Sequence, residues 1–318
     1  MKRIYRIITV FCLVGMCTLS AEDAKPKSDL GKAPWDPKSS DGKLRIICFG
    51  AHPDDVEFNA GGVAAKWAAL GHHVKFVSTT NGDAGHWDLG GAKLARKRYA
   101  EVRRAAEVLG VEESEVLDIH DGELVPTLAT RKIIIDLIRD WQADIVMAHR
   151  PNDYHPDHRY TGVLVQDASF NVTIPTYAPN TPRVQKNPLV LFYYDRFTRP
   201  YPFQAEIVVD IDDVFEQKVD AIVNLESQLF ETVYADDKTR KKRLAEMPKD
   251  AAGRLKAALA RQGGRDSRTA DKYREELAKW YGTEKAGKTK HAEAFEICEY
   301  GRQPSEKEIK RLFPFLPR

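Results

Sequence analysis

The sequence is poor in cysteine, and the positions of the few cysteines do not suit a fold that is stabilised by disulfide bonds. The 318 residues contain four, of which Cys12 and Cys17 lie in an apolar run at the N-terminus. The other two, Cys48 and Cys298, are far apart along the chain. Disulfide-stabilised domains are short and rich in cysteine, so a disulfide scaffold is excluded. Cys48, which lies in an apolar stretch, is expected to be a packed thiol.

The sequence also lacks a strong charge of either sign. Its 49 Lys and Arg residues nearly balance 47 Asp and Glu residues, which gives a formal net charge of +2. This balance gives no reason to expect nucleic acid or an anionic membrane as a partner. Hydrophobic residues make up 42% of the chain, enough for a packed core rather than a disordered chain. The length suits one large α/β domain, or one domain with an appendage.

Long apolar runs are scarce, and one of them stands at the N-terminus. Basic residues precede an apolar run over residues 7–19, which ends in Ser20 and Ala21. This order predicts a secretory signal peptide over residues 1–21, because the run is short for a membrane span; an uncleaved anchor is the alternative. We therefore expect an exported protein, periplasmic or secreted, in which the polar, proline-bearing residues 22–43 form a linker.

Strand-like and helix-like segments alternate along residues 44–235. Short apolar runs predict buried strands, and segments with helical spacing predict helices. The predicted strands cover residues 44–49, 74–79, 116–119, 145–148, 188–195 and 206–210, and the predicted helices cover residues 56–70, 93–109, 130–141, 159–170 and 214–230. This alternation predicts a Rossmann-like α/β fold, in which a parallel sheet carries helices on both faces.

Residues 236–290 have a different composition from the rest of the chain. They are rich in Lys, Arg, Glu and Ala, and they contain few large apolar residues. We predict a helical, peripheral segment. The favoured interpretation is a solvated segment without a specific role, and the alternative is a lid or an interaction arm.

Polar clusters follow the predicted strands, at the place where ligands bind in open α/β sheets. They are residues 52–55 (His-Pro-Asp-Asp), 81–83 (Asn-Gly-Asp), 121–122 (Asp-Gly) and 155–158 (His-Pro-Asp-His). Helix capping alone explains one aspartate at such a place. It does not explain two clusters that each combine histidine with aspartate. We therefore predict a metal site at this edge of the sheet.

The first cluster contains the groups that metal-assisted hydrolysis requires. A catalytic zinc site typically has three ligands from His, Asp or Glu and leaves one position for water. His52 and Asp55 can supply two of these ligands from one turn. Asp54 is then free to take a proton from the water and to return it to a leaving amine.

The second cluster is expected to open a helix, because Pro156 fits the first helical turn. His155 and His158 are three residues apart and share one helical face. One of them can bind the metal while the other faces the substrate, and the spacing leaves open which does which. Asp157 can accept a proton from a ring nitrogen and so fix a tautomer.

The two clusters resemble the signature motifs of the LmbE-like, or PIG-L, deacetylases. The resemblance covers about residues 44–228. It rests on residues 51–55 with the glycine pair 61–62, on residues 155–158, and on residues 80–85, Arg98, Glu101, residues 109–110 and residues 121–122. The members of this family are zinc enzymes that remove N-acetyl groups from glucosamine-containing substrates.

The resemblance implies a role for each matching residue. It implies one Zn²⁺ per chain, although the same ligands also accept iron or another divalent metal. His52, Asp55 and His158 would bind the metal, and Asp54 would be the general base. His155 would polarise the carbonyl and stabilise the oxyanion, with Asp157 orienting it or tuning its pKa. Arg98 and Asp121 would contact the sugar.

The sequence departs from the family pattern at two places. Many members have Glu directly after the paired aspartates, where this chain has Val56 followed by Glu57. Many also have a histidine where Leu225 stands before a Ser-Gln pair, which puts one outer contact in doubt. Residues 293–295 resemble a late segment of the family. Residues 236–290 are therefore interpreted as an insertion, after which residues 291–318 return to the catalytic domain of residues 44–235.

The function that follows is removal of an acetyl group from an N-acetylated amino sugar or a related amide. A carbohydrate-binding protein that keeps the pocket without turnover is the alternative. A nucleotide-binding α/β protein is a further one, but His52 and Pro53 stand where a glycine-rich phosphate loop would be needed. The expected partner is a small-molecule or glycan substrate, with no nucleic acid and no membrane beyond export. The sequence gives no oligomeric state.

Overall fold

The computed structural model describes residues 41–232 and 235–317. The expected signal peptide and nearly all of the expected linker lie outside these residues, so both remain predictions. None of the helices in the described ranges is long and apolar enough to cross a membrane.

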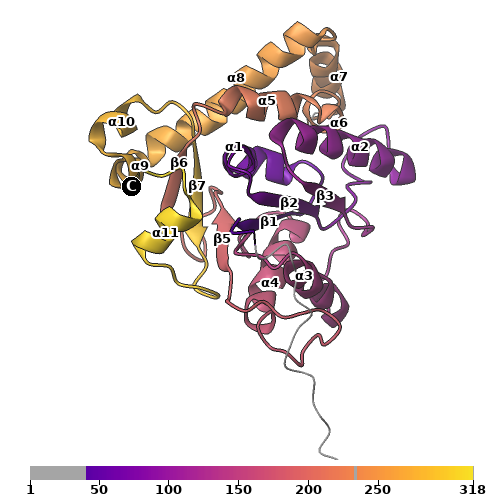
Figure 1. The fold of residues 1–318 in the computed structure, drawn as a ribbon. Coiled ribbons are helices and arrows are strands. Elements are labelled where there is room, and N and C mark those ends of the chain that lie inside the picture. Colours follow the sequence, from indigo (N-terminus) through magenta and orange to yellow (C-terminus); the bar gives the residue numbers. More distant parts are fainter. Residues whose placement is uncertain (1–40, 233–234, 318) are drawn as a thin grey trace, which may run out of the picture. The chain divides into compact units, whose positions relative to one another are not determined.

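The described residues are built around one mixed, seven-stranded sheet, with the strand order β3-β2-β1-β4-β5-β7-β6 (Figure 1). The strands are β1 (Arg45–Gly50), β2 (His73–Ser78), β3 (Glu113–Val116), β4 (Ile145–Ala148), β5 (Leu189–Tyr193), β6 (Ile207–Asp210) and β7 (Ala292–Ile297). The first five strands run parallel, as the strand–helix alternation predicts. Strand β7 runs antiparallel to β5 and to β6.

The central strand β1 is buried on both faces and contributes to two separate cores. Ile46 and Cys48 pack into one core, while Ile47 and Phe49 pack into the other. Successive side chains of a strand point to opposite faces, so an unbroken apolar run serves both. Cys48 is fully buried between its neighbours Phe76 of β2 and Met147 of β4, as expected for a packed thiol.

Helices cover both faces of the sheet (Figure 1). Helices α1 (Asp55–Ala69), α2 (Gly91–Leu109) and α5 (Phe215–Val223) contact one another on one face, and α3 (Leu128–Asp140) and α4 (Pro156–Asn171) contact each other on the opposite face. The remaining helices are α6 (Glu226–Leu229), α7 (Asp237–Glu246), α8 (Ala251–Lys272), α9 (Arg274–Tyr281), α10 (Thr283–Lys288) and α11 (Glu306–Leu312). The layered α/β fold predicted from the sequence is therefore confirmed.

Several elements differ from the sequence prediction, among them β3, the helix after β6, and β7. Strand β3 comes three residues earlier than predicted, because the polar stretch Glu113–Val116 pairs with β2 at the edge of the sheet. The single helix predicted over residues 214–230 is two helices, α5 and α6, which Asn224 and Leu225 separate. Strand β7, which places residues 292–297 between β5 and β6, was not predicted as a strand.

Candidate metal centre and active site

The predicted site lies where the order of the parallel strands reverses. Strand β1 has β2 on one side and β4 on the other, so the loops after β1 and β4 leave the sheet at neighbouring positions. Such a crevice is the usual ligand site of an open α/β sheet. The loop after β1 carries His52 and leads into α1, and the loop after β4 leads into α4 with His155 at its N-cap.

The structure brings His52, Asp55 and His158 together. The His52 Nδ1 atom lies 3.2 Å from His158 Nε2 and 3.5 Å from Asp55 Oδ2, and His158 Nε2 lies 3.5 Å from the same oxygen. Three atoms that each lie about 2.0–2.2 Å from a tetrahedral ion are roughly 3.3–3.5 Å apart. The triangle therefore has the dimensions of three ligands of one metal ion.

The second nitrogen of each imidazole faces a carboxylate. His52 Nε2 lies 3.0 Å from Asp121 Oδ1 and 3.3 Å from Asp157 Oδ2, and His158 Nδ1 lies 3.2 Å from Asp153 Oδ1. A carboxylate behind a histidine fixes its tautomer and raises its basicity as a ligand. Each ring is thus oriented so that its other nitrogen faces the triangle.

Negative charge at the site favours a bound cation. Burial lowers the pKa of His52, but hydrogen bonds to Asp121 and Asp157 outweigh it and hold that pKa well above its usual value. Burial acts in the same direction on His158, and Asp55 and Asp153 raise its pKa in spite of it. The residues present therefore fit a divalent ion, both in spacing and in charge. Three other groups of side chains also have ligand atoms within 4.8 Å of one another. They are His52 with His155 and His158, Asp55 with His149 and His158, and His52 with Asp121, His155 and Asp157.

Asp55 is held in place by the backbone of its own loop. Its Oδ2 atom accepts hydrogen bonds from the backbone amides of Ala51 (2.9 Å) and His52 (2.8 Å). It also lies 3.2 Å from His149 Nε2. The His149 ring stacks on His158 with the ring centroids 4.0 Å apart. His149 therefore supports two of the three predicted ligands.

Asp54 is buried and its carboxylate is not used for capping. It is the N-cap residue of α1, yet its side chain makes no capping hydrogen bond, and only 6% of the residue is exposed. Burial and the neighbouring Asp55 raise the pKa of Asp54 to about 6. A carboxyl group with such a pKa can both accept and release a proton near neutral pH.

His155 lies beside the triangle, with its ring centroid 4.6 Å from that of His52. Its Nδ1 atom accepts a hydrogen bond from the backbone amide of Asp157 (3.2 Å), so the ring proton of neutral His155 is on Nε2. Burial and the charges of His52 and His158 lower the pKa of His155. The structure therefore favours a neutral ring that can donate a hydrogen bond from Nε2.

The Asp157 carboxylate contacts a ring nitrogen of His52, whereas the family resemblance implied His155 as its partner. Its oxygens accept hydrogen bonds from the backbone amides of Gly122 (2.7 Å) and Leu124 (3.2 Å), and one of them contacts His52. It is His52 rather than His155 that these contacts orient. The charge of Asp157 still opposes the lowering of the His155 pKa, as a smaller effect.

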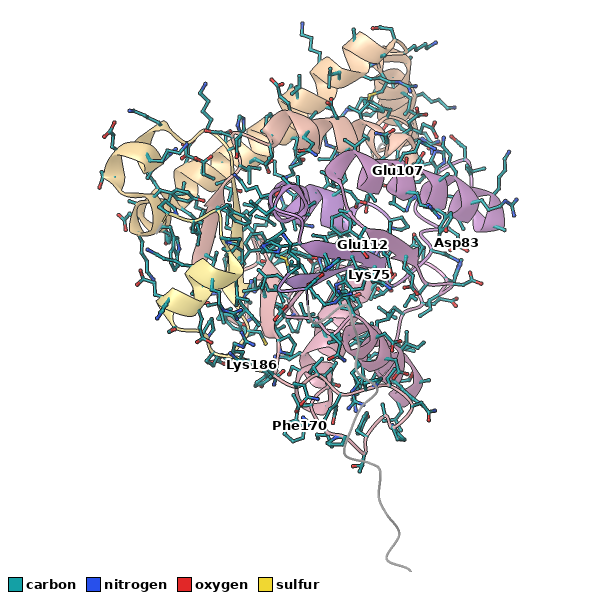
Figure 2. All side chains as sticks on the ribbon, in the orientation of Figure 1. Lys75, Asp83, Glu107, Glu112, Phe170 and Lys186 are labelled. Atoms are coloured by element: carbon teal, nitrogen blue, oxygen red, sulfur yellow. The ribbon has the colours of Figure 1, made fainter. Side chains whose placement is uncertain are left out.

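Arg98 and Asp121, the predicted sugar contacts, have partners within the protein. Arg98 is buried and donates to the backbone oxygen of Gly85 (2.8 Å) and to Gln228 Oε1 (2.7 Å). Asp121 lies against His52, and its backbone amide donates to Asp83, which is labelled in Figure 2 in the loop after β2. Both residues thus organise the loops around the triangle, and their contact with a sugar stays a prediction.

Asp153 is a site residue that the sequence analysis missed. It is 8% exposed, it contacts His158 Nδ1, and it accepts a hydrogen bond from the backbone amide of His155 (3.0 Å). Its position, two residues before His155 in the same loop, was the available signal.

A cavity of about 940 Å³ opens beside the triangle, and Asp55, His158, His149 and Asp153 form part of its wall. The other residues that line it come from α1, from the loop after β4, from the end of β5 and the segment after it, and from α8. Aromatic rings on this lining are those of Phe58, Tyr154, Tyr193, Tyr194 and Phe197. Helix α8 belongs to the segment 236–290, so at α8 this segment is packed against the rest of the protein rather than solvated on all sides, and whether it has a role stays a prediction.

Comparison with known proteins identifies relatives of the segment that carries the site. The family model PIG-L, GlcNAc-PI de-N-acetylase, matches residues 47–169, a range that contains every predicted site residue. A diacetylchitobiose deacetylase of Thermococcus kodakarensis is 34% identical over 199 residues, which cover 60% of this chain and 72% of that protein. A 1D-myo-inositol 2-acetamido-2-deoxy-alpha-D-glucopyranoside deacetylase of Catenulispora acidiphila is 25% identical over 46% of this chain and 54% of that protein.

Solved structures share the fold. The N,N'-diacetylchitobiose deacetylase of Pyrococcus horikoshii matches 85% of this chain and 88% of its own, with a TM-score of 0.60 and 25% identity. The 4-carboxy-2-hydroxymuconate hydratase of Pseudomonas putida matches 83% of this chain and 99% of its own with a TM-score of 0.61, but at 19% identity it shows the fold alone. The match over residues 47–169 and the Thermococcus relative together show that the chain belongs to the PIG-L family of de-N-acetylases.

Proposed function

We propose that this protein is a zinc-dependent hydrolase that removes an acetyl group from an N-acetylated amino sugar. The observation that carries the proposal is the triangle of His52, Asp55 and His158, with atoms 3.2–3.5 Å apart, beside the buried carboxyl group of Asp54. Membership of a de-N-acetylase family and the deacetylase activity named for the Thermococcus relative give the class of reaction. Zinc is proposed because it binds imidazole and carboxylate ligands in a tetrahedral arrangement.

The ion would be held by His52 Nδ1, Asp55 Oδ2 and His158 Nε2. Its contribution to the chemistry is Lewis acidity, which makes water a stronger acid and an amide carbonyl a better electrophile. The protein contributes the rest. Asp54 takes the proton of the attacking water and delivers it to the nitrogen of the leaving amine, and the C–N bond of the acetamide breaks to give acetate and a free amine.

His155 is placed to stabilise the negative charge that develops on the carbonyl oxygen. Because its Nδ1 atom accepts the backbone amide of Asp157, the Nε2–H group is the available donor. A preorganised donor at a developing oxyanion commonly contributes a rate factor of about 10²–10³. The neutral ring serves this purpose, so the proposed mechanism does not need a protonated His155 at the start of the reaction.

The function is tested by amine release from a panel of N-acetylated sugars, with the metal content measured in the same samples. We expect Asp54→Ala to keep the metal content of the wild type and to lower kcat by about 10²–10⁴-fold, the usual contribution of a general acid–base group. Asp54→Asn, which keeps the shape of the side chain, is the matched variant and should lose activity to a similar degree.

Two outcomes would contradict this proposal. Wild-type rates in the Asp54→Ala variant would remove Asp54 from the role of general base. Absence of amine release by the metal-loaded wild type across the panel would favour a carbohydrate-binding protein that does not turn over its ligand.

A further inference from the structure

The cavity beside the metal triangle has a wall of positive charge. The helix α8 contributes Arg261, Arg265, Arg268 and Lys272 to its lining, and the segment after β5 contributes Arg196. The four α8 positions are spaced by four, three and four residues, so they form a single stripe along the helix. The stripe faces the same cavity as the predicted ligands Asp55 and His158.

Protein carboxylates form no ion pair with this wall in the described part of the chain, although the charge of Asp54 acts on the pKa of Arg261. Within the part of the chain that the structure describes, no carboxylate lies within 4.0 Å of a charged nitrogen of these five residues. The acidic residues of the lining are engaged elsewhere: Asp55 in the triangle, Asp153 with His158, Asp195 with Arg150 at 2.9 Å and Asp271 with Arg274 at 2.5 Å. The charge of the wall is therefore available to a ligand.

The stripe is unfavourable for the helix itself. Cations three or four residues apart on one helical face repel each other, and each pair destabilises the helix by a few tenths of a kcal/mol. A local rule broken in this way, without an ion pair to the stripe in the described residues, is typical of a functional surface.

The wall is attached firmly to the metal site. Arg265 donates to Asn59 Oδ1 (2.6 Å), and Asn59 Nδ2 donates to the backbone oxygen of Asp55 (2.7 Å), so one side chain links the stripe to the loop of the triangle. On the opposite side of α8, the buried Asp266 forms an ion pair with Lys218 of α5 (2.9 Å), and Lys218 also pairs with Glu293 of β7 (2.8 Å).

Aromatic side chains complete the lining between the triangle and the cations. The ring centroid of Tyr154 lies 6.0 Å from that of Phe197 and 5.7 Å from that of His158. The Lys272 Nζ atom lies 5.0 Å from the ring centroid of Tyr194. Rings of this kind offer flat apolar faces to a sugar. A cavity of about 940 Å³ is of the size that proteins use for small ligands.

We infer that the substrate is an anionic N-acetylated saccharide, in which a carboxylate, sulfate or phosphate group binds the cationic wall while the acetamide lies at the metal triangle. This inference rests on the proposed deacetylase function, and it adds a charge requirement carried by α8. The family match ends at residue 169, so the residues that impose this requirement lie outside the matched segment.

The test compares matched neutral and charged substrates. N-acetylglucosamine is compared with its 6-sulfate and its 6-phosphate, and N,N'-diacetylchitobiose with glucuronosyl-N-acetylglucosamine, so the arms separate sulfate, phosphate and carboxylate. We expect kcat/KM to be at least about tenfold higher for the charged member of one or more pairs, since a charge-assisted hydrogen bond contributes on that scale. The preference should shrink as salt rises from about 0.05 to 0.5 M, because salt screens the interaction.

The variant that tests the wall is the double substitution Arg261→Gln/Arg268→Gln. It should lower the charged-over-neutral ratio of kcat/KM by about tenfold, mainly through KM, and Arg261→Lys/Arg268→Lys should keep most of the ratio. Lys256→Gln is the matched control, because Lys256 is exposed on the same helix and does not line the cavity. Equal metal content and thermal unfolding among the variants show that they are folded.

Failure of the inference can be told apart from failure of the proposed function. Amine release from neutral substrates with no preference for charged ones, or an equal loss of preference in Lys256→Gln, overturns the charge requirement and leaves the deacetylase function standing. If no substrate releases an amine, calorimetric titration with N-acetylglucosamine 6-sulfate decides. Binding that weakens at least about tenfold in Arg261→Gln/Arg268→Gln supports the charged site, and equal binding overturns it.

Discussion

At the scale of single residues, the site depends on carboxylates that orient imidazoles. The sequence predicts His52 and Asp55 as ligands because they follow a strand that ends at this edge of a parallel sheet, and the family resemblance selects His158 rather than His155 as the third. It does not predict the partners of their second nitrogens. Asp121 reaches His52 from a third loop. Spacing along a chain shows which residues share a turn or a helical face, but not which loops meet in space.

Removal of the carboxylates behind His52 should weaken metal binding. We expect Asp121→Ala and Asp157→Ala each to lower metal affinity by about 10–100-fold, because a metal-bound imidazole loses basicity and orientation without its carboxylate. The affinity is measured by competition with a chromogenic chelator, and Asp220→Ala on the exposed side of α5 is the control.

The two substitutions also separate the two roles considered for Asp157. If Asp157→Ala kept wild-type metal affinity and changed only the pH profile of kcat, its role would be with His155. In that case, the contact of Asp157 with His52 would not contribute to metal affinity.

At the scale of elements, the position of α4 depends on a glycine. A Cβ atom on Gly162 would lie 2.4 Å from the backbone oxygen of His149, so only glycine lets the helix pack this closely on the loop after β4. His158 lies one helical turn before Gly162 on the same helix. The close approach therefore helps to set the distance from His158 to the loop after β1.

Gly162→Ala should move α4 and loosen the metal triangle. We expect a loss of about 1–3 kcal/mol in the free energy of unfolding of the metal-free protein, since overpacking forces the backbone apart, together with weaker metal binding. Urea unfolding and metal titration measure the two effects.

Gly287→Ala in α10, where a Cβ atom meets nothing within 4 Å, is the control and should be neutral or slightly stabilising. Unchanged metal affinity in a destabilised Gly162→Ala protein would show that His158 does not depend on this contact.

The elements that the sequence could and could not predict differ in how they are buried. Strands buried on both faces, such as β1 and β5, are mainly apolar runs, and the sequence predicts their bounds within two residues. Strand β7 carries Glu293 and Glu296, both buried, so its pattern does not resemble a core strand. Strand β3 is at an edge and is held by pairing with β2 rather than by hydrophobic burial. Pairing between distant segments has no signal in a local pattern.

At the scale of the whole molecule, metal binding should stabilise the fold, because the ligands come from two segments about a hundred residues apart. A ligand that binds only the folded state at 100 times its Kd adds about 2.7 kcal/mol. For a protein of this size, that corresponds to a rise in Tm of roughly 4–5 °C. The rise is measured by thermal unfolding with and without zinc after chelation. His158→Ala should lose the rise, and an equal rise in that variant would place the stabilising ion elsewhere.

The domain organisation was predictable from the sequence only in part. The composition of residues 236–290 indicates helices, and the structure has α7 to α10 there. Composition gives no information on where a charged helix lies, and a stripe of cations looks like a solvated face when its surroundings are unknown. The boundaries proposed for the catalytic domain and the insertion, and the export of the protein, stay predictions.

The buried ion pairs of Lys218 have a consequence for how this protein can change. One charged side chain from each of α5, α8 and β7 meets there, and Glu293 also accepts the backbone amides of Gly62 and Val63 in α1. Loss of Asp266 with this helix would leave Lys218 paired with Glu293 alone, so one cation and one carboxylate would remain and their charges would balance. A shortened version of this enzyme without α8 would therefore keep a paired Lys218, but it would expose the parts of α5 and β7 that this helix now covers.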